Sequence, residues 1–274
     1  MNGEFDLDAY LKRIGYAGDR AASRATLAGL TLAHAQAIPF ESLDPLLGRP
    51  VRLDIASLQE KLVGASRGGY CFEHNALLQR ALAALGFSVT GLAARVVMNL
   101  PPDTVTARTH MVLKVELADG PAIADVGFGG MTPTGPLLLR TGLVQGTPHE
   151  SFRLADSDGE YRLDALIGDT WTPIYRFDLQ PQTTADYEVT NFYTSTHPAS
   201  AFVTRLIAAR PVPGGRWALS NTSLARHRLG GETERRTLSS AAELRDALTD
   251  IFGIVPPADA GLEPALARIA GGEA

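Results

Sequence analysis

One segment, residues 67–75 (RGGYCFEHN), contains the only thiol of the 274-residue chain, Cys71. Gly68 and Gly69 precede it, and glycines let the backbone turn sharply and let a substrate approach closely. The apolar spacing that follows places Cys71 at the start of a helix, where the helix dipole favours the thiolate, which is the nucleophilic form. A lone cysteine is more often an inert buried residue that packs as a small apolar group. The two glycines and the helix start favour a nucleophile here.

A nucleophilic cysteine needs a general base, and the base needs a group that orients it. The candidate bases are His34, His74, His110, His149, His197 and His227. His110 precedes an apolar run, and Asp125 closes the next run, across the Asp119-Gly120 turn. If Asp119 and Gly120 form a two-residue turn, paired residues of the two strands have numbers that sum to 239. The partner of His110 would then be Gly129, which is four residues from Asp125. At about 3.3 Å per residue this offset is too long for a hydrogen bond. The spacing therefore permits a Cys-His-Asp triad only with a bulge, a bend or another register.

Polar residues around the nucleophile have structural explanations that compete with chemical ones. Glu41 and Arg67 could form a buried ion pair that holds the nucleophile loop. Glu73 suits the first turn of the helix, where acidic residues are favoured. His74 could act as a second base or a metal ligand, but without a second cysteine or a nearby carboxylate cluster we expect a packed structural histidine. An arginine-rich stretch, residues 205–236, is expected to form a solvated face, with one arginine possible at the phosphate of a ligand.

The first 86 residues are dominated by helical spacing of apolar residues, with glycine or proline at the ends. Cys71, Leu78, Leu82 and Leu85 fall on one face of the clearest helix, which ends before Gly86. The helices are predicted over residues 5–14, 23–37, 57–62 and 71–85.

From residue 87 the pattern changes to short apolar runs between Gly, Pro and Asp, which is typical of strands and hairpins. Helical character returns near residue 186, and Pro256-Pro257 breaks the chain before a Gly/Ala-rich tail, residues 258–274, which could cover a cleft or be disordered. Strands are predicted over residues 89–98, 111–117, 122–126, 151–154, 161–165, 170–177 and 217–220, and helices over 186–195, 199–208 and 240–252. The order predicts an α+β protein of two or three subdomains.

Composition and charge exclude several classes of function. The net charge of −5 gives no field that attracts nucleic acid or an anionic membrane. No apolar run approaches the roughly 18 residues of a membrane span, and the polar, acidic start is unlike a signal peptide. One cysteine cannot form an internal disulfide, so a reducing compartment, the cytoplasm, is expected.

Three segments together resemble the signatures of the arylamine N-acetyltransferases: Arg67-Gly-Gly-Tyr-Cys71, Thr109-His110 and Asp125-Val-Gly-Phe-Gly129. Two more are similar to other segments of that family, Ile38-Pro-Phe-Glu41-Ser-Leu43 before the nucleophile and Asn191–Pro198 with Ser200–Phe202 after it. The matches occur in order across nearly the whole chain.

The resemblance implies a helical bundle over residues 1–86 with the nucleophile, a β-barrel over 87–185 with His and Asp, and an α/β lid with a tail over 186–274. It implies a cysteine-protease-like core in which Cys71 accepts the acyl group, His110 is the base and Asp125 orients it. The implied reaction is acetyl transfer from acetyl-coenzyme A to the nitrogen of arylamines, arylhydrazines or arylhydroxylamines by a ping-pong route. No metal is implied, and the chain is expected as a monomer or homodimer.

The resemblance also implies binding residues. Thr109, Gly127, Gly129 and Gly130 are placed beside coenzyme A, because glycines expose N–H groups that can hold an anion. The alternative for the glycines is a tight turn after a strand. An arylamine is largely uncharged at neutral pH, so its pocket should be apolar. Phe40, Tyr70 and Phe128 are the candidate walls, although each could be ordinary core.

Other functions stay open at this point. An amide synthase of the same superfamily, which closes a polyketide macrolactam through the same cysteine, is the nearest alternative. A hydrolase would pass the acyl group to water, and a non-catalytic binder of aromatic ligands would tolerate a broken triad.

Overall fold

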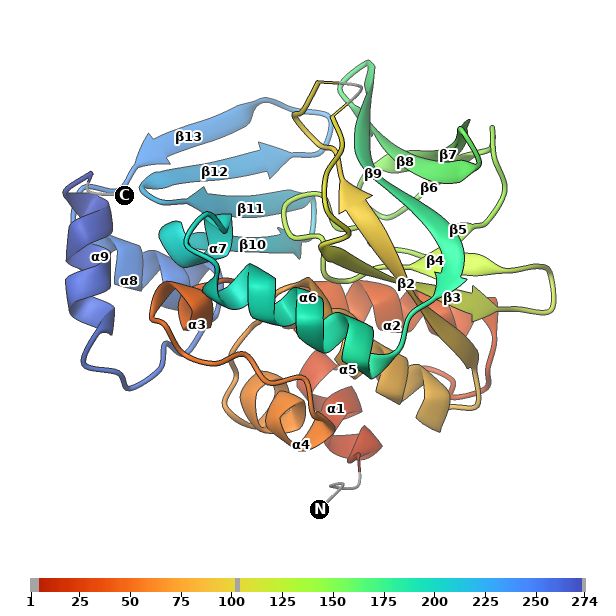
Figure 1. Ribbon diagram of the computed structural model, residues 1–274, viewed down its shortest axis with the longest axis horizontal. Helices are drawn as coiled ribbons and strands as arrows, with labels where there is room; N and C mark the ends of the chain where they lie inside the picture. Colours follow the sequence, from red (N-terminus) through yellow and green to blue (C-terminus); the bar gives the residue numbers. More distant parts are fainter. Residues whose placement is uncertain (1–4, 102–103, 273–274) are drawn as a thin grey trace.

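The computed structural model describes residues 5–101 and 104–272, and its first part is a bundle of helices (Figure 1). Local signals define their ends: the Asp6 carboxylate accepts the Ala9 N–H at 2.9 Å, and Gly15, at φ +67°, ends the first helix. The bundle contains α1 (Leu7–Ile14), α2 (Arg24–Ala37), α4 (Ile55–Leu58), a π-helical segment Gln59–Gly64 and α5 (Cys71–Ala84), whereas the short α3 (Leu43–Leu46) packs into the core of the C-terminal region. The four predicted helices are thus present, with ends shifted by a few residues.

The middle of the chain forms an eight-stranded antiparallel sheet in the order β5-β4-β3-β2-β9-β8-β7-β6. Its strands are β2 (Ser88–Val96), β3 (His110–Glu116), β4 (Ala122–Ala124), β5 (Leu137–Leu138), β6 (Val144–Gly146), β7 (Ser151–Ser157), β8 (Glu160–Ile167) and β9 (Thr170–Pro181). The amide side chain of Gln145 on the edge strand β6 bonds both backbone groups of Leu138 on the opposite edge strand, β5. The sheet is therefore a nearly closed barrel, as expected.

A second antiparallel sheet lies beside the barrel, with helices packed against it (Figure 1). Its strands, in order, are β1 (Phe40–Glu41), β10 (Ile207–Val212), β11 (Gly215–Ser220), β12 (Ser223–Arg228) and β13 (Thr233–Thr237). The C-terminal helices are α6 (Thr184–Thr196), α7 (Ala201–Thr204), α8 (Ala241–Asp246) with a π-helical segment Ala247–Ile251, and α9 (Leu262–Ala270). Because β1 comes from the N-terminal region and pairs with β10, this sheet connects the two ends of the chain. The division at residues 86 and 185 stays a prediction.

The C-terminal region differs from one prediction and answers one question that the sequence left open. The predicted helix over residues 199–208 ends after the short α7, and β10 follows, because β10 pairs with β1 on one side and β11 on the other. The tail is not featureless in its described part: α9 buries Leu262, Leu266 and Ile269 at helical spacing in the core shared with the second sheet. The conformation of β10 is therefore set by its strand partners, and the position of α9 is set by the burial of its apolar face.

Among the described residues, the helices are too short or too polar for any of them to span a membrane. The largest apolar cluster joins the bundle to strands β3 and β4, and it contains Cys71. A separate cluster fills the barrel, and β3, which begins with His110, contributes side chains to both clusters.

Candidate active site

Cys71 is the first residue of α5 and is buried, with 4% of its surface exposed. The preceding Tyr70 is extended, and its N–H donates to the Glu73 carboxylate at 3.0 Å, which fixes the start of the helix. The Sγ atom lies 3.6 Å from the Thr109 carbonyl oxygen. The nucleophile loop therefore presents the thiol at a helix N-terminus and against the start of β3.

His110 and Asp125 are brought together by a register that differs from the predicted two-residue turn. Val115 pairs with Ala122 and Leu113 with Ala124, so paired positions sum to 237 rather than 239. The longer connection moves Asp125 two residues nearer to His110 along the sheet. His110 Nε2 lies 2.7 Å from Asp125 Oδ2, and both side chains are buried. Of the three conditions under which a His110–Asp125 hydrogen bond could form, the structure therefore shows a changed strand register.

The electrostatics of this pair favour an imidazolium beside a carboxylate. Burial lowers the pKa of His110, but the charge and hydrogen bond of Asp125 outweigh it, and a hydrogen bond with Cys71 acts in the same direction, so the pKa is raised. Burial raises the pKa of Asp125, yet His110 and two further donors lower it below its usual range. Since Nε2 is held by Asp125, Nδ1 is the nitrogen left for the thiol. The site can therefore carry a thiolate–imidazolium pair.

Asn75 is a functional residue that sequence reasoning missed, although it lies in the nucleophile segment. Its Nδ2 donates to Asp125 Oδ1 at 3.0 Å and to the Met111 carbonyl at 2.8 Å, and its Oδ1 accepts the Val126 N–H at 3.0 Å. Asn75 thus ties α5 to β3 and to the end of β4. Its position four residues after Cys71, on the same face of the helix, was the available signal.

Two of the predicted coenzyme residues contact the nucleophile. Gly127 packs so closely that a Cβ atom there would lie 2.7 Å from the Cys71 Cα atom, and the Thr109 carbonyl oxygen lies 3.6 Å from Cys71 Sγ. Gly129 has φ +80° and faces the Phe40 ring, and a Cβ at Gly130 would meet nothing within 4 Å. Gly127 is needed for close packing, whatever it binds.

Arg216 holds this glycine loop from the second sheet and corrects the expectation of a solvated arginine face. It is 2% exposed, forms a bidentate ion pair with Glu150, and donates to the Gly130 carbonyl at 2.6 Å. A buried guanidinium is tolerated here because its donors meet a carboxylate and a carbonyl.

The three predicted pocket walls occupy different places. Phe128 packs edge-on against the His110 ring, with centroids 5.2 Å apart. The ring centroids of Phe40 and Phe202 are 5.9 Å apart, and those of Tyr70 and Phe202 are 5.4 Å apart. Tyr70 is fully buried, and its hydroxyl donates to Asn191. Phe202 therefore joins the aromatic group.

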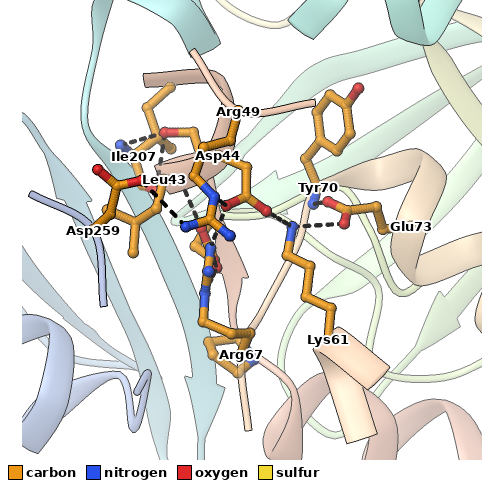
Figure 2. Close-up of polar contacts among 12 residues, drawn as sticks. Leu43, Asp44, Arg49, Lys61, Arg67, Tyr70, Glu73, Ile207 and Asp259 are labelled. Carbon is orange, nitrogen blue, oxygen red and sulfur yellow. Dashed lines mark hydrogen bonds and ion pairs between the residues drawn. The ribbon is translucent and has the colours of Figure 1, made fainter. Parts of the chain in front are cut away.

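A network of buried charges lies next to the nucleophile loop, residues 67–71 (Figure 2). Arg67 lies 2.7 Å from Glu41, which is the predicted ion pair, and 3.2 Å from Asp44. Figure 2 shows Lys61 pointing between Asp44 and Glu73, at 2.6 Å from each. Burial lowers the pKa of Lys61, but the surrounding carboxylates raise it overall. The ammonium is therefore charged and holds Glu73, the residue that caps the helix of Cys71.

His74 is buried and bonded, in agreement with the expected structural role. Its Nδ1 lies 3.0 Å from His34 Nε2, and its Nε2 lies 3.2 Å from the Pro39 carbonyl oxygen. Both ring nitrogens are thus engaged. Across residues 5–101 and 104–272, no three His, Cys, Asp or Glu side chains are grouped in a way that could hold a metal ion.

Comparison with known proteins agrees with this geometry. A family model described as N-acetyltransferase matches residues 23–259. The arylamine N-acetyltransferase of Mycobacterium tuberculosis H37Rv is 48% identical over 253 residues, covering 91% of this chain and 89% of that protein. The Escherichia coli K12 arylamine N-acetyltransferase is 42% identical over 249 residues, with 90% and 88% coverage.

Solved structures extend the likeness to three dimensions. The Mycobacterium marinum arylamine N-acetyltransferase in complex with CoA superposes with a TM-score of 0.92 at 45% identity, covering 96% of this chain and 99% of that one. The Salmonella typhimurium enzyme gives a TM-score of 0.90 at 37% identity, with 98% and 100% coverage. The sequence matches and the shared fold establish that this chain belongs to the arylamine N-acetyltransferase family.

Proposed function

We propose that this chain transfers an acetyl group from acetyl-coenzyme A to the nitrogen of an arylamine, arylhydrazine or arylhydroxylamine through an acetyl-Cys71 intermediate. The observation that carries the proposal is the buried His110–Asp125 pair, joined at 2.7 Å, beside a cysteine at a helix start. The relatives named arylamine N-acetyltransferase and the M. marinum complex with CoA support the donor and the acceptor class.

In the first half of the reaction, the Cys71 proton passes to His110 Nδ1, because Nε2 is held by Asp125. The thiolate attacks the thioester carbonyl carbon, and a new carbon–Sγ bond forms as the bond to the coenzyme sulfur breaks. The coenzyme thiolate leaves with the proton from Nδ1. Asp125 stabilises the imidazolium throughout, and Asn75 holds the carboxylate in place.

In the second half, the amine nitrogen attacks the acetyl carbonyl carbon, and the carbon–Sγ bond breaks. The proton that the nitrogen loses passes through His110 to Cys71, which restores the thiol. The sum is one thioester and one amine converted to one amide and one thiol. Donor and acceptor then use the same cysteine in turn, which is a ping-pong scheme.

The aromatic rings and the glycine loop supply the binding side of this proposal. Phe128 beside His110 and Phe40 beside Phe202 are apolar surfaces suited to an uncharged aryl ring. A Cβ at Gly130 would meet nothing within 4 Å, and this open space on the glycine loop is where the coenzyme arm would lie.

The experiment is intact-protein mass spectrometry after brief mixing with acetyl-coenzyme A, with and without an arylamine or a hydrazine. We expect one acetyl group on Cys71 that disappears when the amine is added. Loss of the adduct without amine would indicate a hydrolase. A folded protein with a reactive thiol and no adduct would contradict the proposal and favour the amide-synthase alternative.

The proposal includes the compartment and the state of association. The free, buried thiol at Cys71 suits a reducing compartment, and we propose the cytoplasm. We propose a monomer or a homodimer, which light scattering after size-exclusion chromatography measures directly.

A further inference from the structure

Arg216 is a buried cation of the second sheet, and the mechanism above does not use it. It lies on β11, only 2% of its side chain is exposed, and the side chain of its partner Glu150 is 14% exposed. Taking a guanidinium out of water is costly unless its donors are paired. An arginine at the surface of the sheet would avoid this cost. The place to which Arg216 directs its donors is therefore informative.

The donors of Arg216 reach two separate segments of the barrel region. Nε donates to Glu150 Oε1 at 2.9 Å and Nη2 donates to Glu150 Oε2, so the pair is bidentate. Nη1 donates to the Gly130 carbonyl oxygen at 2.6 Å. A bidentate carboxylate fixes the plane of the guanidinium and neutralises its charge. Glu150 thus aims Nη1 at the glycine loop, residues 127–130.

The first end of the glycine loop is attached to the catalytic pair. The Gly127 N–H donates to Asp125 Oδ1 at 2.9 Å, and the Phe128 ring packs edge-on against His110. Both partners belong to the barrel region and not to the second sheet. A change in the second sheet should therefore leave the surroundings of the thiol in place.

The other end of the loop is attached to the second sheet. Gly129 has φ +80°, and its carbonyl oxygen accepts the Thr132 N–H at 3.2 Å, so the chain turns sharply here. Among the described residues, a Cβ at Gly130 would meet nothing within 4 Å, so space is open beside the turn. Because a peptide unit is planar, the bond from Arg216 to the Gly130 carbonyl also sets the direction of the Met131 N–H.

We propose that Arg216, oriented by Glu150, is a positioning residue for the acyl donor, and that it holds the outer end of the glycine loop in the shape that accepts the coenzyme arm of acetyl-coenzyme A. This inference rests on the proposed function, because it concerns recognition of the same donor. Arg216 bonds the loop and not the triad, so it acts on binding of the coenzyme and not on the chemistry at Cys71.

Positioning and direct attraction predict opposite effects of removing the Glu150 charge. A guanidinium that attracted a coenzyme phosphate would bind more tightly once its carboxylate partner was neutral. A guanidinium that positions the loop would support binding less well, because it needs Glu150 to orient it. The burial of Arg216 and its bidentate pair favour positioning, since its charge is neutralised inside the protein.

The test compares two donors that acetylate the same cysteine. 4-Nitrophenyl acetate has no coenzyme arm, and 4-nitrophenolate leaves when the thiolate attacks its ester carbonyl. For Arg216→Gln we expect the second-order rate constant of Cys71 acetylation by acetyl-coenzyme A to fall roughly tenfold, the size of one charge-assisted hydrogen bond. The Kd of coenzyme A, measured by isothermal titration calorimetry, should rise by a similar factor. The rate constant with 4-nitrophenyl acetate should match that of the wild type.

Arg210→Gln is the matched control. Arg210 lies on the neighbouring strand β10, and its guanidinium also donates to backbone carbonyls, those of Gln36 at 2.7 Å and Phe252 at 3.0 Å. Neither carbonyl belongs to the glycine loop. This variant should lower Tm, as Arg216→Gln does, and leave the Kd of coenzyme A and both acetylation rate constants unchanged.

Two further variants keep the proposal falsifiable. Glu150→Gln should weaken coenzyme A binding as Arg216→Gln does, and tighter binding would overturn the proposal in favour of a phosphate contact. Arg216→Lys keeps a cation for Glu150 but loses the fork, so a folded protein with a smaller, donor-specific loss is expected even if Arg216→Gln does not fold.

The remaining outcomes refute the proposal. Equal losses with both donors would reduce Arg216 to general support of the fold, and wild-type constants in the Arg216 variants would show that the loop keeps its shape without it. Failure of the proposed function is distinguishable, because the wild type itself would then form no acetyl-Cys71 from acetyl-coenzyme A.

Discussion

Acid should destabilise this protein through a chain of buried hydrogen bonds that runs from α1 to the nucleophile loop. The Tyr10 hydroxyl lies 2.9 Å from His34 Nδ1, His34 Nε2 lies 3.0 Å from His74 Nδ1, and His74 Nε2 lies 3.2 Å from the Pro39 carbonyl oxygen. The carbonyl can only accept, so His74 Nε2 carries a proton, and each neutral ring then donates in the same direction. Tyr10 must donate to His34. A proton added to His34 Nδ1 would turn this acceptor into a donor, and the Tyr10 O–H would lose its hydrogen-bond acceptor.

The magnitude follows from the pKa of His74. Burial lowers that pKa from 6.5 to about 4, and burial also lowers the pKa of His34 well below its ordinary value. In the unfolded chain both rings take up protons near pH 6.5, so the unfolded state binds more protons as the pH falls. The stability that the neutral buried histidines contribute is therefore present above pH 6.5, and it is lost as the pH falls toward 4. At about 1.4 kcal/mol per pH unit, His74 alone accounts for about 3 kcal/mol.

Two nearby groups change stability in the opposite direction. The pKa of His110 is raised, so its contribution is present below pH 6.5 and declines only at higher pH. The pKa of Glu73 is raised by burial, which favours the folded state on acidification. A comparison with a variant at His74 cancels both effects, because the two proteins share them.

The assay is urea unfolding at intervals from pH 7 to pH 4 for the wild type and His74→Gln. The glutamine keeps an amide donor for Pro39 but does not titrate. We expect the variant to be less stable at pH 7 by about 1 kcal/mol, because one bond of the chain is lost. Between pH 7 and pH 4 the difference in unfolding free energy should shift by about 3 kcal/mol in favour of the variant, so that the order of stability reverses. If the unfolding free energies of the wild type and of His74→Gln change in parallel from pH 7 to pH 4, the conclusion that His74 is buried in its neutral form is refuted.

Four further outcomes are expected. Cys71→Ala should remove the acetyl adduct and the transfer activity while far-UV and near-UV circular dichroism stay unchanged. Asp125→Asn should lower kcat/KM by about three to four orders of magnitude, because the imidazole is held in the wrong tautomer, as steady-state kinetics will measure. Lys61→Met should lower the unfolding free energy by about 3–5 kcal/mol in urea titrations, because Glu73 stays buried without its cation; unchanged stability would contradict the proposed charge network. Gly127→Ala should slow acylation of Cys71 in stopped-flow experiments, because its Cβ would lie 2.7 Å from the Cys71 Cα; a wild-type rate would show that the loop adapts freely.

Local sequence signals determined the elements that depend on nearby residues. The start of α5 could be read from the glycines before Cys71 and from Glu73, since capping and helical spacing involve neighbours in the chain. The charge pair of Glu41 and Arg67 was also foreseeable, because Arg67 begins the nucleophile segment and Glu41 lies in the family segment that precedes it.

Long-range pairing decided what local signals left open. Residues 207 and 208 were expected to end a helix, and instead they begin β10, because β1 at Phe40–Glu41, some 167 positions earlier in sequence, and β11 supply its hydrogen bonds. Arg216 was expected in a solvated stretch, and it is buried because Glu150 and the Gly130 carbonyl meet it from another sheet. A single residue's pattern cannot reveal a partner from a distant strand.

The triad shows the same division at the level of single atoms. The sequence by itself determined that a cysteine begins a helix and that His110 and Asp125 flank a hairpin, because residue type and local spacing are written in the chain. Only the tertiary structure decided that paired positions sum to 237, and so that the two side chains meet at 2.7 Å. Only the structure revealed that Asn75 donates a hydrogen bond to Asp125 and so holds its carboxylate in place. Register and burial depend on how separate elements pack, and packing is a property of the whole fold.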